Sequence, residues 1–407
     1  MVKVAFWFDA PLQYTGGLNY IKNLLHALSL VNDGSVQPYV FFTHDVPDDI
    51  ARQFERLACV VRTRLLQRRT LPWFTHKVLY KKFDSMAMAN ALMRSHGIDV
   101  VSHAWFHYKG RPPFKVISWI PDFQYLHLPE LFPTINPAAE TRKYQDVIRK
   151  SDVVVLSSND AFEDFRRIAP PGHESRVAVL RFVSQPSQSA TASTLTLQAM
   201  EQKHGFKGRY FLLPNQFWAH KNHTVVLEAV RLLQEKGVPV QVLCTGNTVD
   251  YRVGGTPYID GLRAFMARHG LDGQVKILGL IDYADVLCLM RHCVAVLNPS
   301  RFEGWSSSVE EAKSMGKPVV LSRIGVHVEQ APAQGHYFDP DDAAGLADIL
   351  GRLWEKTNDV SQVDLENAAT AALRERTLAF GRNYLQILKD VADGRKALAR
   401  PALGTGG

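Results

Sequence analysis

The sequence NPSRFEGWSSSVEEAKSMGKPVVL, residues 298–321, predicts the unit from which a parallel sheet is built. An apolar run at 294–297 predicts a strand, and a polar loop follows Pro299. A helix then begins among the serines and ends at Gly316, and a second strand follows at 318–321. This order of strand, loop, helix and strand is typical of an α/β fold with a parallel sheet.

The loop and the helix of this unit carry two acidic residues, Glu303 and Glu311. Ligands of open α/β sheets bind outside the carboxyl ends of the strands, where this loop lies, and a helix N-terminus suits a phosphate. Ser306, Ser307 and Ser308 would supply the free N–H groups. Alternatively, Ser308 and Glu311 would form a capping box and Glu303 would be a solvated loop acid. The residues alone leave both interpretations open.

The spacing of this stretch resembles the signature of family 4 retaining glycosyltransferases, which have the GT-B fold. The family pattern P-S-x-x-E-G-F-G, then E-A, then G-x-P-V-V, is matched at 299–304, 311–312 and 316–320. Two positions depart from the pattern, Trp305 for Phe and Ser306 for Gly.

The resemblance implies a role for each acid. In the family the first Glu contacts hydroxyls of the donor sugar and the second holds the ribose of the nucleotide, which assigns these contacts to Glu303 and Glu311. A carboxylate suits either contact because it accepts two hydrogen bonds from adjacent hydroxyls, each worth about 1.5 to 3 kcal/mol. On one continuous helix the two acids would lie about 12 Å apart along the axis, too far for the carboxylate pair of a hydrolase.

A second segment of the family pattern, G-R-x-x-x-x-K, is similar to residues 215–221. In the family its Arg and Lys neutralise the donor diphosphate. Lys221 matches the Lys, and Gln216 stands where Arg is usual, so one positive charge is missing at the leaving group. The resemblance assigns Gln216, Lys221 and Ser307 to donor binding, with the helix dipole and loop N–H groups adding to the stabilisation by Lys221.

In the first half of the chain, Gly16 and Gly17 stand between a predicted strand at 2–8 and an amphipathic helix. Two glycines there either let the backbone approach a phosphate or permit a tight turn. Family 4 enzymes often carry a Gly pair at this place, near the donor phosphates and the acceptor. No G-x-G-x-x-G occurs here, which disfavours a dehydrogenase.

The usual catalytic His of the family is absent at its matching position, where this chain has Pro121. Asp122 matches the acid that follows that His, and it would orient an acceptor hydroxyl or stabilise a cationic transition state. His103, His107 and His127 are near in sequence and are candidates to replace the missing His, although a lone His is more often structural.

Strands alternating with helices in both halves predict two doubly wound domains. The resemblance implies that these Rossmann-like domains face each other across a cleft. We place an acceptor-binding domain at 1–183, a linker at 184–207 on account of its polar stretch, and a nucleotide-sugar-binding domain at 208–375. The helical pattern that ends near 391 predicts that 376–407 holds a helix crossing back to the first domain, then a frayed tail.

Composition limits the class of protein. The 407 residues carry a net charge of +7 and contain no signal peptide and no run of about 18 apolar residues, which favours the cytoplasm. The four cysteines do not stand at metal-ligand spacing and are expected to be reduced thiols. No Asp-x-Asp motif ends a predicted strand, so we expect no metal and no cofactor beyond the nucleotide sugar.

Residues 56–83 contain eight Lys or Arg residues and no acidic residue, interleaved with Leu, Trp, Phe and Tyr. This composition suits an anionic membrane surface, with about 1 kcal/mol per cation. The alternatives are a solvated helix face or a groove for an anionic acceptor. Nucleic acid fits less well because no nucleic-acid motif accompanies the stretch.

The sequence therefore predicts a retaining glycosyltransferase that moves a sugar from a nucleoside diphosphate sugar to a glycan or lipid-linked acceptor. A role in cell-surface polysaccharide or lipopolysaccharide assembly, at the inner face of the membrane, would fit the basic stretch. Two alternatives remain open: a nucleotide-sugar epimerase of GT-B fold, and a protein that binds nucleotide sugars without catalysis.

Overall fold

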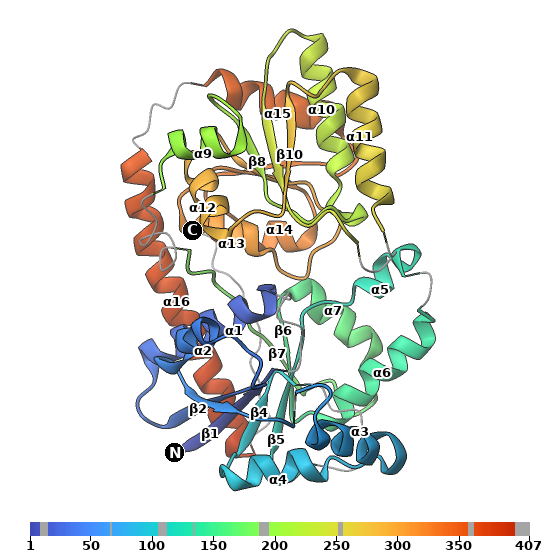
Figure 1. Ribbon diagram of the computed structural model, residues 1–407, viewed down its shortest axis with the longest axis vertical. Coiled ribbons are helices and arrows are strands. Elements are labelled where there is room, and N and C mark those ends of the chain that lie inside the picture. The colour runs from blue at the N-terminus through green and yellow to red at the C-terminus, as the bar shows by residue number, and fades with distance from the viewer. Residues whose placement is uncertain are drawn as a thin grey trace. The chain divides into compact units, whose positions relative to one another are not determined.

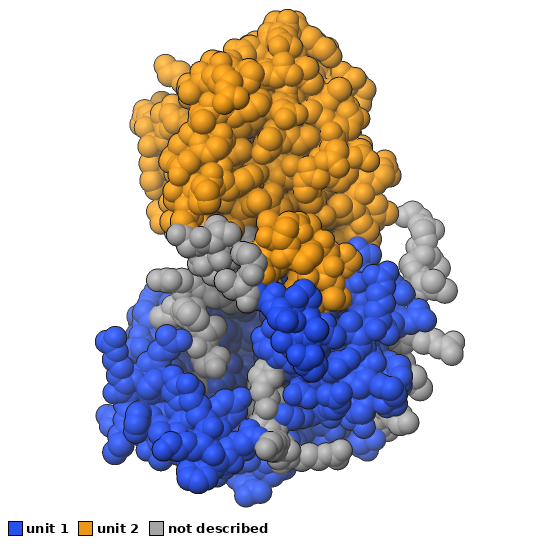
Figure 2. Space-filling model, turned by 90° about the vertical axis from the view of Figure 1, so that its right-hand side faces the viewer, with its two compact units in different colours: residues 1–123, 135–182, 376–407 blue, residues 124–134, 183–375 orange. Residues whose placement is uncertain are grey.

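The computed structural model describes residues 1–8, 15–65, 67–104, 112–132, 135–186, 195–250, 255–356 and 362–394. The chain forms two compact units, coloured separately in Figure 2. Unit 1 comprises residues 1–123, 135–182 and 376–407, and unit 2 comprises residues 124–134 and 183–375. No helix in the described ranges is both long and apolar enough to cross a membrane.

Unit 1 is built on a seven-stranded parallel sheet of order β3-β2-β1-β4-β5-β6-β7. Its strands are β1 (Val2–Trp7), β2 (Val36–Phe42), β3 (Cys59–Arg62), β4 (Val100–Ser102), β5 (Lys115–Ile120), β6 (Val153–Leu156) and β7 (Val177–Val179). Its helices are α1 (Thr15–Val31), α2 (Asp48–Glu55), α3 (Leu71–Phe83), α4 (Ala87–Ser95), α6 (Pro137–Lys150), α7 (Asn159–Ile168) and the C-terminal part of α16 (Gln362–Ala392).

Unit 2 is built on a six-stranded parallel sheet of order β10-β9-β8-β11-β12-β13. Its strands are β8 (Phe211–Leu213), β9 (Val242–Thr245), β10 (Val275–Gly279), β11 (Val296–Asn298), β12 (Val319–Ser322) and β13 (Gly335–Phe338). Its helices are α5 (Gln124–His127), η1 (Pro129–Leu131), α9 (Leu197–His204), η2 (Ala219–Lys221), α10 (His223–Glu235), α11 (Pro257–His269), α12 (Tyr283–His292), α13 (Ser307–Ser314), α14 (Gly325–Gln330), α15 (Ala343–Glu355) and the start of α16.

Helices cover both faces of the sheet in unit 2, as Figure 1 shows. Apolar side chains of α10, α11 and α15 form one core cluster with the strands. Those of α9, α12 and α13 form a second cluster on the opposite face. Every residue of β8, β9, β11 and β12 is buried, because a parallel strand has a helix layer on each side.

The predicted fold class is confirmed, since both units are doubly wound α/β folds with all strand pairs parallel. The sequence missed one strand, β13, in which only Phe338 is buried. It also gave residues 184–207 to a linker, whereas α9 lies within that range and buries Met200 against unit 2. The structure makes 362–392 one helix, whose residues up to 375 belong to unit 2 and the rest to unit 1.

Candidate functional site

The candidate site lies where the strand order of unit 2 reverses. Strand β8 pairs with β9 on one side and with β11 on the other, and such a switch point leaves room for a ligand at the carboxyl ends of the strands. Two buried asparagines mark this place: Asn215 follows β8, Asn298 ends β11, and Asn215 Nδ2 donates to Asn298 Oδ1 at 3.1 Å. The loops after β8, β11 and β12 therefore form one site.

Two residues predicted from different segments contact each other at this site. Lys221 Nζ lies 2.6 Å from Glu303 Oε1, and only 14% and 8% of the two side chains are exposed. Burial alone would raise the pKa of Glu303, but the charge of Lys221 and the hydrogen bonds from Lys221 and Ser300 lower it to about 2. Glu303 is thus ionised, and it is not the solvated loop acid of the local interpretation.

Hydrogen bonds to backbone carbonyls hold the loop after β8 against the loop after β11. Asn222, which caps α10 in a left-handed conformation, donates from Nδ2 to the carbonyls of Pro299 at 3.2 Å and Pro340 at 2.9 Å. The N–H of Arg301 donates to the carbonyl of His220 at 2.8 Å. These contacts fix Lys221 beside the loop that carries Glu303.

The helix that follows the loop begins with an uncapped turn. Ser306 is the N-cap of α13, and its side chain makes no capping hydrogen bond. The alternative interpretation, a capping box of Ser308 and Glu311, is therefore wrong, because the helix begins earlier than that box requires. The N–H of Ser306 donates to Gln330 at 3.3 Å, so Ser307 and Ser308 remain to present first-turn N–H groups. Ser307 itself is exposed.

Glu311 lies inside α13, whereas Glu303 lies in the loop before it, so a common helix does not fix their separation. Tyr283 at the start of α12 donates its hydroxyl to Glu311 Oε1 at 2.7 Å. Burial raises the pKa of Glu311 to about 7, and the Tyr283 hydrogen bond offsets only part of this effect. The two acids of the motif are thus in opposite electrostatic settings.

Gln216, which stands where the family has Arg, is engaged with the neighbouring loop. Its Oε1 accepts a hydrogen bond from the N–H of Asn247 at 2.6 Å. Gly246 comes just before, with φ of 149°, and a Cβ there would lie 2.4 Å from the carbonyl oxygen of Asn215. Only glycine lets this loop pass so close to the end of β8.

The remaining predicted residues belong to unit 1. Gly16 and Gly17 lie in the first turn of α1, not in a turn before it, and neither has a positive φ. The tight-turn interpretation is therefore wrong, while a helix N-terminus is still a place for an anion. Asp122 follows β5 and is half-buried.

The three histidines proposed as replacements have different surroundings. His103 accepts or donates hydrogen bonds at both ring nitrogens, with Tyr20 at 2.9 Å and Ser102 at 2.8 Å, and burial lowers its pKa to about 3. His107 is outside the described residues. His127 is exposed in α5, which belongs to unit 2, and its ring packs 5.2 Å from that of Phe302, the residue before Glu303.

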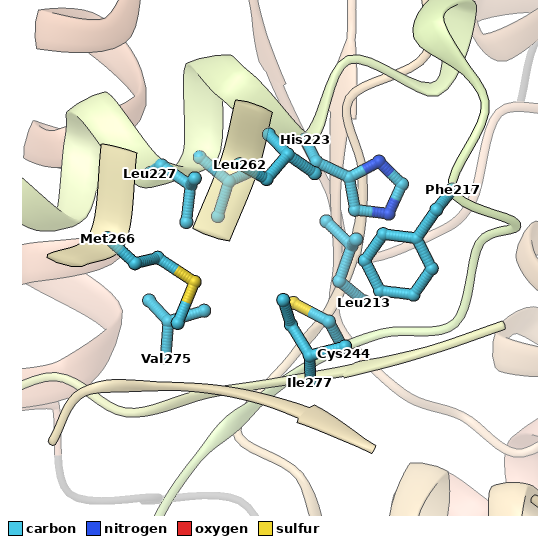
Figure 3. Close-up of a pocket in the computed structure, with 10 residues that line it drawn as sticks. Leu213, Phe217, His223, Leu227, Cys244, Leu262, Met266, Val275 and Ile277 are labelled. Carbon is cyan, nitrogen blue, oxygen red and sulfur yellow. The ribbon is translucent and has the colours of Figure 1, made fainter. Parts of the chain in front are cut away.

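His223 has a packing role in unit 2. Its ring stacks on Phe217 at 4.6 Å, and both rings line a small cavity between α10, α11 and the sheet. Figure 3 shows that the other labelled side chains around this cavity are apolar, apart from the thiol of Cys244. Burial lowers the pKa of His223 to about 3, so the ring is neutral.

Contrary to the prediction, an Asp-x-Asp sequence does follow one of the strands. Asp339, Pro340 and Asp341 directly follow β13, so an Asp-x-Asp sequence does end a strand. Asp341 pairs with Arg301 at 2.5 Å, and Asp339 accepts the N–H of Asp341 at 3.0 Å. Within the described ranges, no group of three or more His, Cys, Asp or Glu side chains is arranged to hold a metal ion.

Sequence reasoning missed Tyr283, Asn298 and His327 as members of the site. The Asn298 amide joins β8 to α13 through its contacts with Asn215 and Ser306. The signal that identifies such a residue is a polar side chain at the end of an otherwise apolar strand. Tyr283 and His327 stand outside every motif, so only the fold reveals them.

Part of unit 2 matches a known protein family. Residues 198–370 match the model of the family described as glycosyl transferases group 1. The comparison with curated proteins gave no match.

Several solved structures are similar to the whole chain at low sequence identity. The Anabaena protein HepE in complex with UDP and glucose has 16% identity and a TM-score of 0.65, covering 96% of this chain and 100% of its own. Sucrose-phosphate synthase from Thermosynechococcus elongatus gives the same values. WaaG, a glycosyltransferase involved in lipopolysaccharide biosynthesis, has 16% identity and a TM-score of 0.55, covering 96% of this chain and 97% of its own. The segment that holds the candidate site is thus similar to glycosyl transferases group 1, and the chain as a whole has the GT-B fold.

Proposed function

We propose that the protein is a retaining, metal-independent glycosyltransferase that uses a nucleoside diphosphate sugar as donor. The observation that carries this proposal is the buried pair of Lys221 and Glu303 beside the N-terminus of α13, at the switch point of unit 2. A cation and free N–H groups suit a diphosphate, and a carboxylate suits sugar hydroxyls. HepE, which has the same fold, was solved with UDP and glucose, and this supports a nucleotide sugar here.

Different groups of this site would bind different parts of the donor. Lys221 and the N–H groups of Ser307 and Ser308 would bind the diphosphate and stabilise the charge that develops on it as it leaves. Glu303 would accept hydrogen bonds from the sugar hydroxyls, and Glu311 from the ribose. Because Lys221 pairs with Glu303 in the free protein, a bound diphosphate competes for this cation. Electrostatic stabilisation of the leaving group would be the largest contribution of the protein.

Transfer with retention would follow a same-face route. The bond between the anomeric carbon and the phosphate oxygen breaks, and its electron pair goes to the diphosphate. The acceptor oxygen attacks the same face and gives its proton to the departing phosphate oxygen. We assign Asp122, Gly16 and Gly17 to the acceptor and the phosphates, and Gln216 to the donor.

The acceptor would be a glycan or a lipid-linked glycan at the inner face of the cytoplasmic membrane. Helix α3 supports this part of the proposal because none of its side chains is buried. Leu71, Phe74 and Phe83 are 77%, 59% and 69% exposed, next to Lys81 and Lys82. An exposed helix with large apolar side chains and cations suits an anionic lipid surface.

The test is release of nucleoside diphosphate from a panel of sugar nucleotides, with thermal shift in parallel, each with and without EDTA. Slow release from one donor that survives EDTA supports a metal-independent transferase, and anomeric analysis of the product tests retention. Conversion of the donor sugar without an acceptor would instead indicate an epimerase. Stabilisation by a donor without any turnover, in wild type and Glu303→Ala alike, would indicate a non-catalytic binding protein.

A further inference from the structure

His327 is a fully buried polar residue next to the candidate donor site. It lies in α14, which follows β12, and 0% of it is exposed. Its Nδ1 lies 2.9 Å from the carbonyl oxygen of Ser322 and 3.1 Å from the hydroxyl of the same residue. Because a carbonyl oxygen only accepts, Nδ1 carries the proton and Nε2 has a free lone pair.

A chain of hydrogen bonds leads from His327 to the sugar-binding acid. The Ser322 hydroxyl donates to the carbonyl of Ser300. The Ser300 hydroxyl in turn lies 2.7 Å from Glu303 Oε1 and 2.7 Å from Asn298 Oδ1. His327 therefore fixes Ser322, Ser322 holds the backbone of Ser300, and the Ser300 side chain contacts Glu303.

Packing alone does not explain a histidine at this position. Its Nε2 is buried and has no hydrogen-bond partner among the described residues. Such an unsatisfied group is unfavourable, and an apolar side chain would avoid it. The contact of Nδ1 with Ser322 offsets this cost, and it is a contact that an apolar side chain could not make.

We propose that His327 is a positioning residue of the donor site, which orients Glu303 toward the donor sugar through Ser322 and Ser300. This inference rests on the proposed function for its effect on the donor. The hydrogen bonds that begin at His327 lead to Glu303, whose carboxylate is assigned to the sugar. They do not lead to Glu311, which is assigned to the ribose. Loss of His327 should therefore affect recognition of the sugar more than recognition of the nucleotide.

The first test needs no ligand. A double-mutant cycle measures the unfolding equilibrium constants of His327→Leu, Glu303→Gln and the double variant in urea. If the chain of contacts couples the two residues, the double variant departs at least fivefold from the product of the single effects. Independent effects would overturn the proposal whether or not the protein proves to be a transferase.

The second test separates positioning from stability. Calorimetry compares the affinities of folded wild type and variants for UDP and UDP-glucose, and for GDP and GDP-mannose. We expect His327→Leu to weaken binding of the recognised sugar nucleotide at least fivefold and to change that of the free diphosphate less than twofold. His327→Asn, whose amide N–H replaces Nδ1–H, should restore binding, and His327→Gln, whose amide matches Nε2, should not.

Equal weakening for the free diphosphate and its sugar ester, or equal behaviour of the Asn and Gln variants, would overturn the proposal. A wild type that binds none of these four compounds, and no other donor of the panel, would count against the proposed function. The double-mutant cycle would still decide whether His327 positions Glu303.

Discussion

Two carboxylates of one motif have opposite pKa shifts because their partners differ. Glu303 has a cation, Lys221, at 2.6 Å, and its pKa falls to about 2. Glu311 has only the neutral hydroxyl of Tyr283 as a described partner, and burial raises its pKa to about 7. The free protein thus keeps Glu303 ionised, while Glu311 titrates near neutral pH.

Replacing Glu311 with Gln should stabilise the free protein above neutral pH. The folded pKa of about 7 lies above the usual 4.5, so the stability that protonated Glu311 gives is complete below pH 4.5 and is lost as the pH rises through 7. A shift of this size corresponds to about 3 kcal/mol. Gln stays neutral and still accepts from Tyr283, so Glu311→Gln should exceed wild type in urea denaturation at pH 8, yet match it at pH 4.5.

The same substitution should weaken binding of the nucleotide at pH 8, because the ribose hydroxyls lose a charged acceptor. In wild type, affinity should fall as the pH drops through 7 and Glu311 takes up its proton. If the free energies of unfolding of the two proteins change in parallel with pH across this range, the pKa of Glu311 is not raised.

Removing the charge of Lys221 should destabilise the protein in a pH-dependent way. Lys221→Met leaves Glu303 buried without its counter-ion, which typically costs about 3 to 5 kcal/mol. The lowered pKa of Glu303 means that its stabilising effect is present above pH 4.5 and lost as the pH falls toward 2. As the pH is lowered, the free energy of unfolding should therefore fall less in Lys221→Met than in wild type. The double variant Lys221→Met with Glu303→Gln should recover stability. A double variant no more stable than Lys221→Met would contradict the ion pair.

At the scale of elements, replacing glycine with alanine should have opposite effects on stability at two helix positions. Gly381 of α16 packs on α1, and a Cβ there would lie within 2.3 Å of the carbonyl oxygen of Ala27. Gly381→Ala should therefore force α16 away from α1 and lower stability by about 2 kcal/mol or more. Gly261 of α11 has nothing within 4 Å of that position, so Gly261→Ala should raise stability by about 0.5 to 1 kcal/mol.

Thermal and urea denaturation of both variants check this pair. Since each change adds one methyl group in the middle of a helix, the helix propensity gained is the same, and only the packing differs. Equal effects of the two substitutions would mean that α16 and α1 do not pack as closely as the structure has them.

The sequence predicted the elements better than the contacts between them. Apolar runs predicted β1, β11 and β12, whereas β13 was not predicted because it begins with Gly335 and buries only Phe338. Lys221 and Glu303 were each assigned to the donor, but their contact joins loops 82 residues apart. Only the sheet order, with β8 beside β11, brings those loops together, and no local pattern encodes that order.

At the scale of the whole molecule, the chain exchanges segments between its units. Residues 124–134 belong to unit 2, although the segments before and after them belong to unit 1. Residues 376–407 belong to unit 1, although they follow unit 2 in the sequence. Within unit 1, Tyr384 of α16 is buried and donates its hydroxyl to Ser102 at 2.8 Å. Unit 1 therefore needs a segment nearly two hundred residues beyond its sheet, and a cut near residue 183 would not yield a complete domain.

Attachment of the whole protein to anionic membranes should depend on the cations within residues 64–82. Replacing Arg64, Arg68, Arg69, Lys81 and Lys82 with Gln should weaken cosedimentation with anionic vesicles at least tenfold, because each cation near such a surface contributes about 1 kcal/mol. Binding should also weaken with rising salt.

Neutral phosphatidylcholine vesicles and a matched variant distinguish the charged and apolar contributions. Phe74→Ser with Leu71→Ser keeps every cation, and since both side chains are more than half exposed, their replacement should leave folding intact. If the apolar side chains of α3 enter the lipid, this variant also loses vesicle binding, whereas purely electrostatic adsorption would spare it. Vesicle binding unchanged in the charge variant would mean that α3 is a solvated surface, and the acceptor would then have to reach the protein from solution.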